Sequence, residues 1–306
     1  MPRKIIYLIN PISGTRRKSS LQELITRRTR EEGFEFSIHP TRADGDYRSL
    51  IPLIREEGVT DIVICGGDGT VSAVAAALAG VDVNVGIIPM GSGNGLAFAA
   101  RIPARTELAL DLVFKGRASW IDGFFINDQF SCMLCGIGFD AEVAHEFARQ
   151  ARRGLQTYVR VTFNRFFRAQ PFPFRIVLPS ANGGAATSFP VDAFFINIAN
   201  GNQFGNNFTI APKASLQDGL LDIVIVRKAG RFRMLLSVIR QVLGWNAVQH
   251  MPSGRGNTQV LYFQVPSLEI ENPGNAPLHI DGDPKDTATT FRIRTVPKVI
   301  RLIQPV

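Results

Sequence analysis

Residues 61–80 read DIVICGGDGTVSAVAAALAG, and this stretch decides the fold of the first half of the chain. Residues 61–65 form a mostly apolar run with the length of a buried strand, and residues 70–80 have the small and apolar side chains of a buried helix. Between them lies a glycine loop whose one charged side chain is Asp68. A strand, a loop and a helix in this order predict one β–α unit of a parallel sheet.

The same alternation runs through residues 1–120. Apolar runs of strand length alternate there with longer amphipathic stretches, which is the pattern of βαβ units whose sheet is buried on both faces. We therefore predict a doubly wound, Rossmann-like α/β domain over residues 1–120. Its expected strands are 4–9, 35–39, 61–65 and 85–90, and its expected helices are 19–32, 47–57, 70–80 and 106–115.

After residue 120 the pattern changes to short β-rich runs separated by Gly, Pro and Asn. Two helical stretches interrupt these runs, at about residues 141–169 and at residues 231–244. Many short strands with turn residues between them are typical of an antiparallel sandwich or barrel. We predict a mostly antiparallel β-sandwich domain over residues 121–306, and hence an α/β plus β fold. The final strand, around residues 298–303, could rejoin the first domain.

The composition is that of a globular chain with a basic second half. Of the 306 residues 45% are hydrophobic and 20% are charged, and the formal net charge is +8. Most of that charge lies after residue 120. Such an excess indicates an anionic partner, either a nucleic acid or an acidic membrane face, or simply solubilising charge.

The cysteines and the apolar segments indicate the compartment. An odd count of three, Cys65, Cys132 and Cys135, fits a reducing environment better than a disulfide framework. The lone CxxC at 132–135 lacks the second pair that a metal site needs, so we expect buried structural thiols. No segment reaches the roughly 18–20 apolar residues of a membrane span. We expect a cytoplasmic protein that is at most peripheral to a membrane.

Four predicted loops follow predicted strands of the first domain, and three of them combine small residues with hydroxyls or amides in a way that suits phosphate. They are NPISG (10–14), Thr41, GGDGT (66–70) and PMGSGNG (89–95). Ligands of open parallel sheets bind at the carboxyl ends of the strands, where small residues leave backbone N–H groups accessible to an anion. Neither a Walker A motif nor a GxGxxG after the first strand occurs. The loops predict a nucleotide-phosphate site without a P-loop lysine.

The motifs NPISG, GGDGT and PMGSGN, in this order and spacing, resemble the catalytic domain of the diacylglycerol kinase and sphingosine kinase superfamily. In the second half, GIGFDAEV (136–143), SLQDGLLDIVIV (215–226) and IDGDP (280–284) are similar to the β-domain of the soluble bacterial members. The matches extend over residues 9–284. GGDGT alone is less specific, since NAD kinases and phosphofructokinases carry similar loops.

The resemblance implies an ATP- and Mg²⁺-dependent kinase that phosphorylates the hydroxyl of a diacylglycerol-like or sphingoid lipid by in-line transfer. It implies that Asp68 faces the transferring phosphate, that Asp283 is the base for the lipid hydroxyl, and that Asp281 is the rival base. The ATP-site residues that it implies are Asn10, Ser13, Gly14, Thr41, Gly66, Gly67, Asp68, Gly69, Thr70, Ser72, Gly91, Ser92, Gly93 and Asn94. The residues implied to bind a structural Mg²⁺ are Ser215, Asp218 and Leu220, with backbone carbonyls at Ser215 and Leu220.

The sequence departs from the family pattern at two positions. Gly95 stands where the soluble bacterial diacylglycerol kinases usually have Asp, and this leaves Asp68 and Asp122 to maintain the water and metal network. Asp283 stands where the family commonly has Glu, so the side chain of this candidate base is one methylene shorter. Both departures leave the identity of the lipid open.

Residues 149–175 contain seven arginines, six aromatic residues and no acidic residue. Leu155, Val159, Thr162 and Phe166 repeat at helical spacing, which suits either an interfacial helix on anionic lipid or a helix that packs on the β-domain. The helix at 231–244 has a second apolar face, which we expect to lie in the core.

We expect the partners to be a lipid substrate in an anionic membrane and no nucleic acid, and the resemblance is compatible with a homodimer. The expected location is the cytoplasm, with transient binding to the inner membrane surface. Two alternatives are an NAD kinase-like phosphotransferase and a non-catalytic anion-binding protein.

Overall fold

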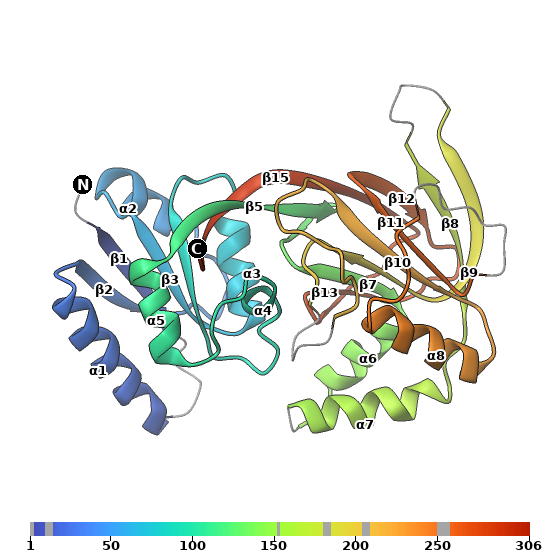
Figure 1. Cartoon of the computed structure of the whole chain (residues 1–306), viewed down its shortest axis with the longest axis horizontal. Coiled ribbons are helices and arrows are strands. Elements are labelled where there is room, and N and C mark those ends of the chain that lie inside the picture. Colours follow the sequence, from blue (N-terminus) through green and yellow to red (C-terminus); the bar gives the residue numbers. More distant parts are fainter. Residues whose placement is uncertain (1–2, 10–14, 152–153, 180–184, 204–208, 250–257) are drawn as a thin grey trace. The chain divides into compact units, whose positions relative to one another are not determined.

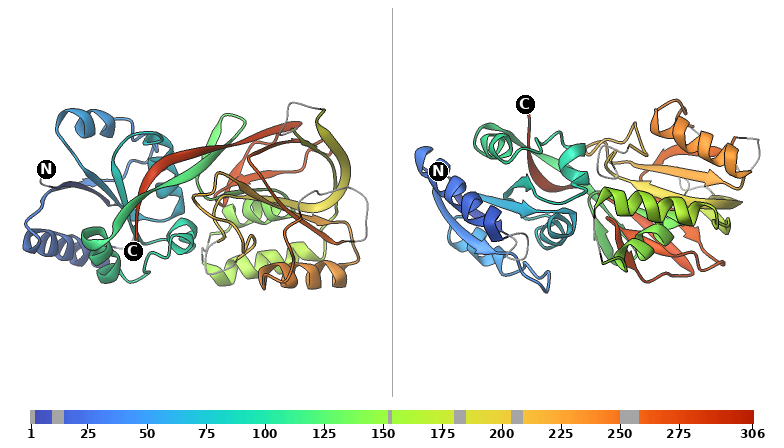
Figure 2. Two further views of the ribbon diagram at one scale, coloured as in Figure 1. Left: turned by 45° about the horizontal axis from the view of Figure 1, so that its top comes forward. Right: turned by 90° about the horizontal axis from the view of Figure 1, so that it is seen from below.

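The computed structural model describes residues 3–9, 15–151, 154–179, 185–203, 209–249 and 258–306 (Figure 1). The chain forms two compact units. Unit 1 is Met1–Ile121 together with Lys298–Val306, and unit 2 is Asp122–Pro297. Two long strands, β5 (Arg117–Ile126) and β15 (Thr290–Gln304), carry the chain from one unit to the other (Figure 2).

Unit 1 is a parallel sheet with the strand order β15-β4-β3-β1-β2, and its described pairings are parallel. Consecutive residues of its central strands are buried, so both faces of the sheet are covered. The strands are β1 (Lys4–Ile9), β2 (Glu35–Pro40), β3 (Asp61–Gly66), β4 (Asn84–Pro89) and the last residues of β15. The helices are α1 (Thr15–Glu31), α2 (Leu50–Glu56), α3 (Asp68–Ala77), α4 (Gly95–Ala99) and α5 (Thr106–Lys115).

Unit 2 is built on antiparallel strands in the order β14-β13-β7-β9-β8-β12-β15, with β10 joined to β9 and β11, and β6 joined to β5. These strands are β6 (Gln129–Ser131), β7 (Leu134–Gly138), β8 (Phe172–Leu178), β9 (Thr187–Ala199), β10 (Leu221–Arg227), β11 (Val260–Val265), β12 (Ser267–Glu271), β13 (Leu278–Ile280) and β14 (Asp283–Lys285). The predicted α/β plus antiparallel β fold class is confirmed.

Alternate residues of these strands enter two separate cores, because successive side chains of a strand point to opposite faces. Ile196 and Ile198 of β9 join a core made mainly by strands. Phe195 and Ala199 of the same strand join a second core, which α6 (Phe139–Ala148), α7 (Leu155–Phe166) and α8 (Arg231–Val242) cover. In two views these three helices lie together on one side of the strands of unit 2 (Figures 1 and 2).

Two helical predictions for the second half need correction. The stretch predicted at about 141–169 is two helices, α6 and α7, because the chain turns at Gly154, whose φ of 113° is open to glycine and strained for other residues. The apolar face of α8, expected in the core, is exposed instead. Of the helices in the described part of the chain, none combines the length and apolarity of a membrane span.

Candidate active site

The glycine loops after β3 and β4 touch each other through their backbones. A Cβ atom on Gly67 would lie 3.0 Å from Gly91 Cα, and a Cβ on Gly91 would lie 2.6 Å from Gly67 Cα. A side chain at either position would force the loops apart, so glycine is required by this close approach. The two loops of unit 1, predicted separately from the sequence, therefore form one surface at adjacent strand ends.

Asp68 joins the two loops. It is the first residue of α3, and its Oδ1 accepts a hydrogen bond of 2.7 Å from the backbone N–H of Gly95. Its Oδ2 would lie 2.6 Å from a Cβ on Gly93, so this glycine leaves room for the carboxylate. A negative charge at the start of α3 is also favoured by the helix dipole. The position of Asp68 is thus set by residues of the second loop as well as its own.

Asn94 closes its own loop. Its Nδ2 donates to Gly91 O at 2.8 Å and its Oδ1 accepts from Gly91 N–H at 2.9 Å, while its backbone takes the left-handed conformation with φ 55°. Asparagine tolerates this conformation better than most residues. Both polar atoms of its amide are therefore occupied in shaping the loop that presents the exposed Ser92.

The remaining predicted ATP-site residues lie at the end of β2, at the end of β3 and in the first turns of α3. Thr41 follows β2, and its N–H donates to Ile9 O at 3.0 Å, so it stays beside the end of β1. Thr70 and Ser72 lie half-buried in the first turns of α3, and the exposed Gly69 lies beside them. The Cβ that Gly66 lacks would lie 3.0 Å from that of Thr70. Asn10, Ser13 and Gly14 lie outside the described residues.

In unit 2 the loop before β10 wraps around Asp122. The N–H of Gly219 donates to Asp122 Oδ2 at 2.7 Å, and the N–H of Asp122 donates to Leu216 O at 2.7 Å. Asp218, in the same loop, accepts from the N–H of Leu220 at 3.0 Å. Burial and then the nearby charge of Asp122 raise the pKa of Asp218.

This loop has a donor set that fits a hard cation. The predicted ligands Ser215, Asp218 and Leu220 lie within six residues of one another and next to the carboxylate of Asp122. Mg²⁺ prefers one or two carboxylates together with other oxygens, and this loop offers the carboxylate of Asp218 close to that of Asp122. Within the described residues, no three His, Cys, Asp or Glu side chains gather as a metal site, so carbonyl oxygens or water would complete the coordination.

The two aspartates at the turn between β13 and β14 differ in their contacts and in their exposure. Ile280 pairs with Asp283, and the two residues between them, Asp281 and Gly282, have positive φ, as in a two-residue hairpin turn. Asp281 Oδ1 accepts hydrogen bonds from Ser131 Oγ at 2.6 Å and from the N–H of Leu134 at 3.1 Å. Asp283 is exposed. The carboxylate of Asp281 is therefore fixed against a second segment.

A row of buried polar side chains lies beside this turn and was not predicted. Gly136 of β7 pairs with Asn197 of β9 and with His279 of β13, so all three occupy one face of the sheet. Asp140 Oδ2 lies 3.5 Å from His279 Nε2, and a Cβ on Gly136 would overlap Asp140 Oδ2. The side chains of Asp140, Asn197 and His279 are each more than 90% buried. Asp140 Oδ2 and Asn197 Oδ1 accept no hydrogen bond from the described residues.

Two family models match the chain and together span both units. The model of the diacylglycerol kinase catalytic domain matches residues 4–126, and the model of the YegS C-terminal NAD kinase beta sandwich-like domain matches residues 134–304. The second match alone covers more than half of the chain. The chain belongs to the YegS-like lipid kinase family.

Relatives of this lipid kinase family agree over nearly the whole length. The "Probable lipid kinase YegS-like" protein of Pectobacterium atrosepticum is 30% identical over 284 residues, which cover 90% of this chain and 88% of that protein. The protein of the same name from Chromohalobacter salexigens is 27% identical, with coverage of 91% and 86%. A crystal structure described as a diacylglycerol kinase from Bacillus anthracis str. Sterne has the same fold, with a TM-score of 0.71, 18% identity and coverage of 99% and 97%.

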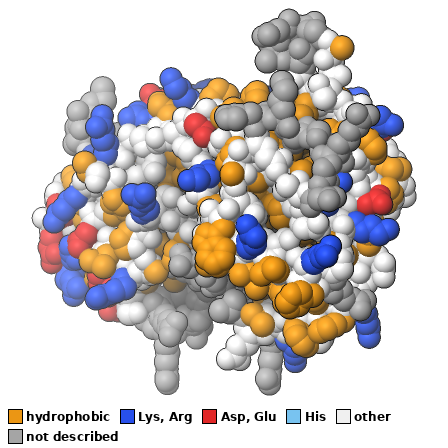
Figure 3. Space-filling view, turned by 45° about the vertical axis from the view of Figure 1, so that its right-hand side comes forward, with side chains coloured by type: hydrophobic (Ala, Val, Ile, Leu, Met, Phe, Trp, Pro, Cys, Tyr) orange, Lys and Arg blue, Asp and Glu red, His pale blue; other side chains and the backbone are white. Residues whose placement is uncertain are grey.

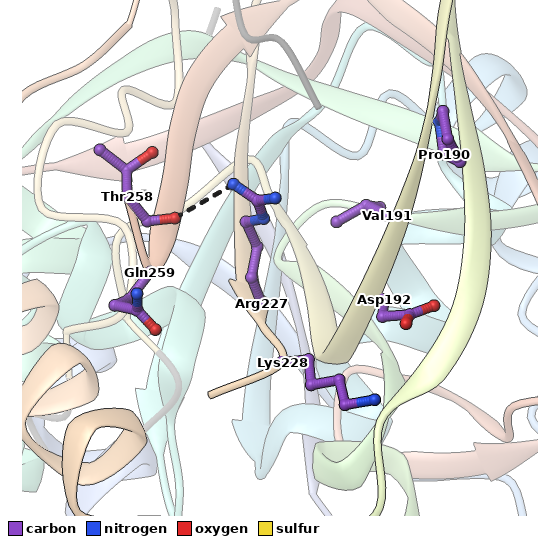
Figure 4. A pocket seen from close by; sticks show the side chains of 7 residues that line it. All are labelled: Pro190, Val191, Asp192, Arg227, Lys228, Thr258 and Gln259. Atoms are coloured by element: carbon purple, nitrogen blue, oxygen red, sulfur yellow. Dashed lines mark hydrogen bonds between the residues drawn. The ribbon is translucent and has the colours of Figure 1, made fainter. Parts of the chain in front are cut away.

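The pocket drawn in Figure 4 contains none of the residues that the family resemblance implies. It has a volume of about 420 Å³ and lies in unit 2, where the pairing of β9 and β10 shifts register at Arg227. Arg227 Nη1 donates to Thr258 O at 3.4 Å across its mouth (Figure 4). The other lining residues are Pro190, Val191, Asp192, Lys228 and Gln259. This pocket and the candidate active site of this lipid kinase are therefore different places.

Proposed function

We propose that this chain is an ATP- and Mg²⁺-dependent lipid kinase that phosphorylates the hydroxyl of a diacylglycerol-like or sphingoid lipid. The observation that carries the proposal is the contact between the two glycine loops, with Asp68 fixed between them, in a chain of the lipid kinase family. An NAD kinase-like phosphotransferase is less well supported, because the relatives that match about nine tenths of the chain are named as lipid kinases.

The loops of unit 1 would hold the nucleotide. The backbone N–H groups of residues 66–70 and 91–95 and the start of α3 offer donors and a partial positive charge to phosphate oxygens. Mg²⁺, when bound, would neutralise charge on the phosphate oxygens during transfer. We assign the binding of that ion or its water to the carboxylate of Asp68, which the N–H of Gly95 holds. The absence of a carboxylate at residue 95 leaves this role to Asp68.

The loop around Asp122 would hold a second, structural Mg²⁺. Asp218 and the backbone carbonyls of Ser215 and Leu220 are its proposed ligands. Asp122 holds the loop by accepting a hydrogen bond from the N–H of Gly219. Such an ion would stabilise unit 2, because it would offset the repulsion between the two carboxylates.

The acceptor hydroxyl requires a base. During transfer its oxygen forms a bond to the γ-phosphorus, the bond from that phosphorus to the leaving ADP oxygen breaks, and the hydroxyl proton passes to a carboxylate. The family resemblance favoured Asp283, but the contacts favour Asp281, because a base must be held in place and only Asp281 of the two is anchored by Ser131 and Leu134.

The substrate of such an enzyme is part of a bilayer, so we propose that the protein acts from the cytoplasm at the inner membrane surface. Its partners would be an anionic membrane and its lipid substrate, with no nucleic acid, and a homodimer is compatible with this role. The charge of the second half favours an anionic surface.

The direct test is incubation with γ-labelled ATP, Mg²⁺ and mixed micelles. The micelles would contain diacylglycerol, monoacylglycerol, sphingosine, ceramide or undecaprenol, and NAD would be offered separately. We expect label in one lipid class. Transfer to NAD alone, or to none of these acceptors, would contradict the proposal.

A further inference from the structure

Helix α8 is firmly attached to unit 2 but presents most of its apolar side chains to solvent. Met234 is buried in the core that the helices cover, and the buried Gln241 donates from Nε2 to Ile210 O at 2.8 Å. On the opposite side Phe232 is 79% exposed and Trp245, just beyond the helix, is 67% exposed. The other exposed apolar residues of this segment are Leu235, Leu236, Ile239 and Leu243.

Helix α7 has the same arrangement. Val161 and Ala169 are buried in the same core as Met234, whereas Phe163 is 61% exposed and packs edge-on against the exposed Phe167, with ring centroids 4.9 Å apart. Val159 is exposed as well. Both helices cover one core and lie on the same side of the strands of unit 2 (Figures 1 and 2), and we name their outward sides the α7–α8 face.

Arginines lie among these apolar side chains. Arg160 and Arg168 of the α7 segment and Arg233 and Arg240 of α8 are exposed, and neither residues 155–170 nor residues 231–249 contain an acidic residue. Arg160, Arg165, Arg168 and Asn164 also line a pocket of about 720 Å³ beside Phe167. Arg165 in that pocket is paired with Glu146 at 2.6 Å. In Figure 3, hydrophobic side chains gather low on the face in view, with Lys or Arg side chains between them.

This combination fits one kind of partner. Singly exposed apolar side chains are ordinary on a protein surface, but nine on two segments that cover the same core mark an interaction surface. Aromatic and aliphatic side chains can enter the acyl boundary of a bilayer, while arginines at the same level remain with lipid phosphates. Neither helical segment carries an acidic residue, and the one carboxylate that lines the pocket, Glu146, is paired with Arg165, so little repulsion would oppose anionic lipid.

We propose that the α7–α8 face inserts into an anionic bilayer, with α8 and Trp245 supplying the apolar contacts and the pocket arginines receiving a lipid phosphate. The inference rests on the proposed function only for its purpose, which is to bring the enzyme to a bilayer-resident substrate. It goes further by naming the surface and by requiring apolar insertion in addition to electrostatic attraction.

Trp245 gives a direct measurement of insertion, because the chain has only one other tryptophan, Trp120. A Trp120→Phe protein would be mixed with phosphatidylglycerol–phosphatidylcholine vesicles whose acyl chains carry bromine. We expect a blue shift and quenching of the Trp245 fluorescence. We also expect part of the binding to persist in about 1 M salt, where charges more than about 3 Å apart are screened.

The paired variants are Leu236→Ser with Ile239→Ser on the face, and Leu108→Ser as the control. Leu108 is 45% exposed, like the two target residues, but belongs to α5 of unit 1. We expect the face variant to lower vesicle affinity by at least about tenfold and the control to leave it unchanged.

A melting curve shows whether each variant is folded. If the double change unfolds the protein, Phe232→Ser is used in its place. Phosphorylation of a water-soluble short-chain diacylglycerol should not change.

Three results would overturn the inference. They are unquenched Trp245 fluorescence, binding that high salt abolishes completely, and a dimer that the face variant dissociates without loss of vesicle binding. Failure of the proposed function looks different, because a chain without kinase activity could still insert into vesicles. Conversely, phosphorylation of soluble lipid without insertion would keep the function and reject this surface.

Discussion

The glycine turns that carry Asp68 in unit 1 and Asp281 in unit 2 are similar in sequence but differ in what holds the carboxylate. Asp68 is fixed by the backbone of another glycine loop, at the N–H of Gly95. Asp281 is fixed by the serine hydroxyl and the backbone N–H of a strand connection, at Ser131 and Leu134. Asp283, two residues further on, is exposed. A carboxylate in a glycine turn is therefore a good candidate for function when a second segment sets its position.

The largest expected effect is at Asp68. In Asp68→Asn the amide oxygen can still accept from Gly95, while the charge is lost, so we expect kcat to fall by about 10²–10³-fold with little change in melting temperature. Asp68→Ala should lose the rate and also about 1 kcal/mol of stability, because the Gly95 N–H loses its acceptor. Asp82→Asn, at an exposed carboxylate of unit 1, is the control. A Asp68→Asn enzyme with a near-normal rate would show that the turn is only structural.

The second prediction separates the two aspartates of the β13–β14 turn. Asp281→Asn keeps an oxygen for Ser131 and Leu134 but removes the proton acceptor, so we expect the rate to fall by about 10²–10⁴-fold. Asp283→Asn should change the rate by less than about threefold, because its side chain is exposed. Steady-state rates with saturating ATP and lipid measure both. The reverse order would assign the base to Asp283, as the family resemblance implied.

The third prediction concerns Mg²⁺ at the Asp122 loop. Mg²⁺ well above its dissociation constant should raise the melting temperature of the wild-type protein by about 5 °C, because the ion binds the folded loop and not the unfolded chain. Asp218→Ala should lose most of this shift. The control is Asp286→Ala, which removes an exposed carboxylate elsewhere in unit 2. Equal shifts in all three proteins would place the ion outside this loop.

The fold class could be predicted because it depends on local periodicity, which residues 61–80 show clearly. The direction of the apolar face of α8 could not. Helical spacing identified the stripe through Phe232, Leu236 and Ile239, but periodicity does not say which stripe is covered. The buried stripe instead contains Met234 and the polar Gln241, whose hydrogen bond to Ile210 no local pattern reveals.

The candidate site divides in the same way. The loops after β3 and β4 were predictable, because each motif follows its own strand directly. The side chain of Asn94 bonds back to Gly91 of its own loop, and this depends on how the loop closes. The row of Asp140, Asn197 and His279 depends on contacts between residues distant in sequence. The polar Asn197 within the apolar run FFINIA, and Asp140 and His279 within motifs already noted, were the available signals.

The smallest expected effect is on the labelling rate of a buried cysteine beside each turn. Cys65 is the residue before Gly66, and Cys135 pairs with Ile280, the residue before Asp281. Both thiols are free and buried, and burial raises the pKa of each, so neither should react with a thiol reagent until its region opens. Both cysteines of the lone CxxC, Cys132 and Cys135, are thus buried, as predicted.

Single-cysteine proteins would measure the opening of the two turns separately. Cys132→Ala with Cys135→Ala leaves Cys65, and Cys65→Ala with Cys132→Ala leaves Cys135. If a second segment holds each carboxylate, Asp68→Ala should speed labelling of Cys65 about fivefold and leave Cys135 unchanged, since the loss of about 1 kcal/mol raises the open population by that factor. Asp281→Ala should do the reverse. Faster labelling of both thiols after either change would mean that the two turns open only when the whole protein unfolds. The turns of Asp68 and Asp281 would then differ in their chemical roles and not in the contacts that hold their carboxylates.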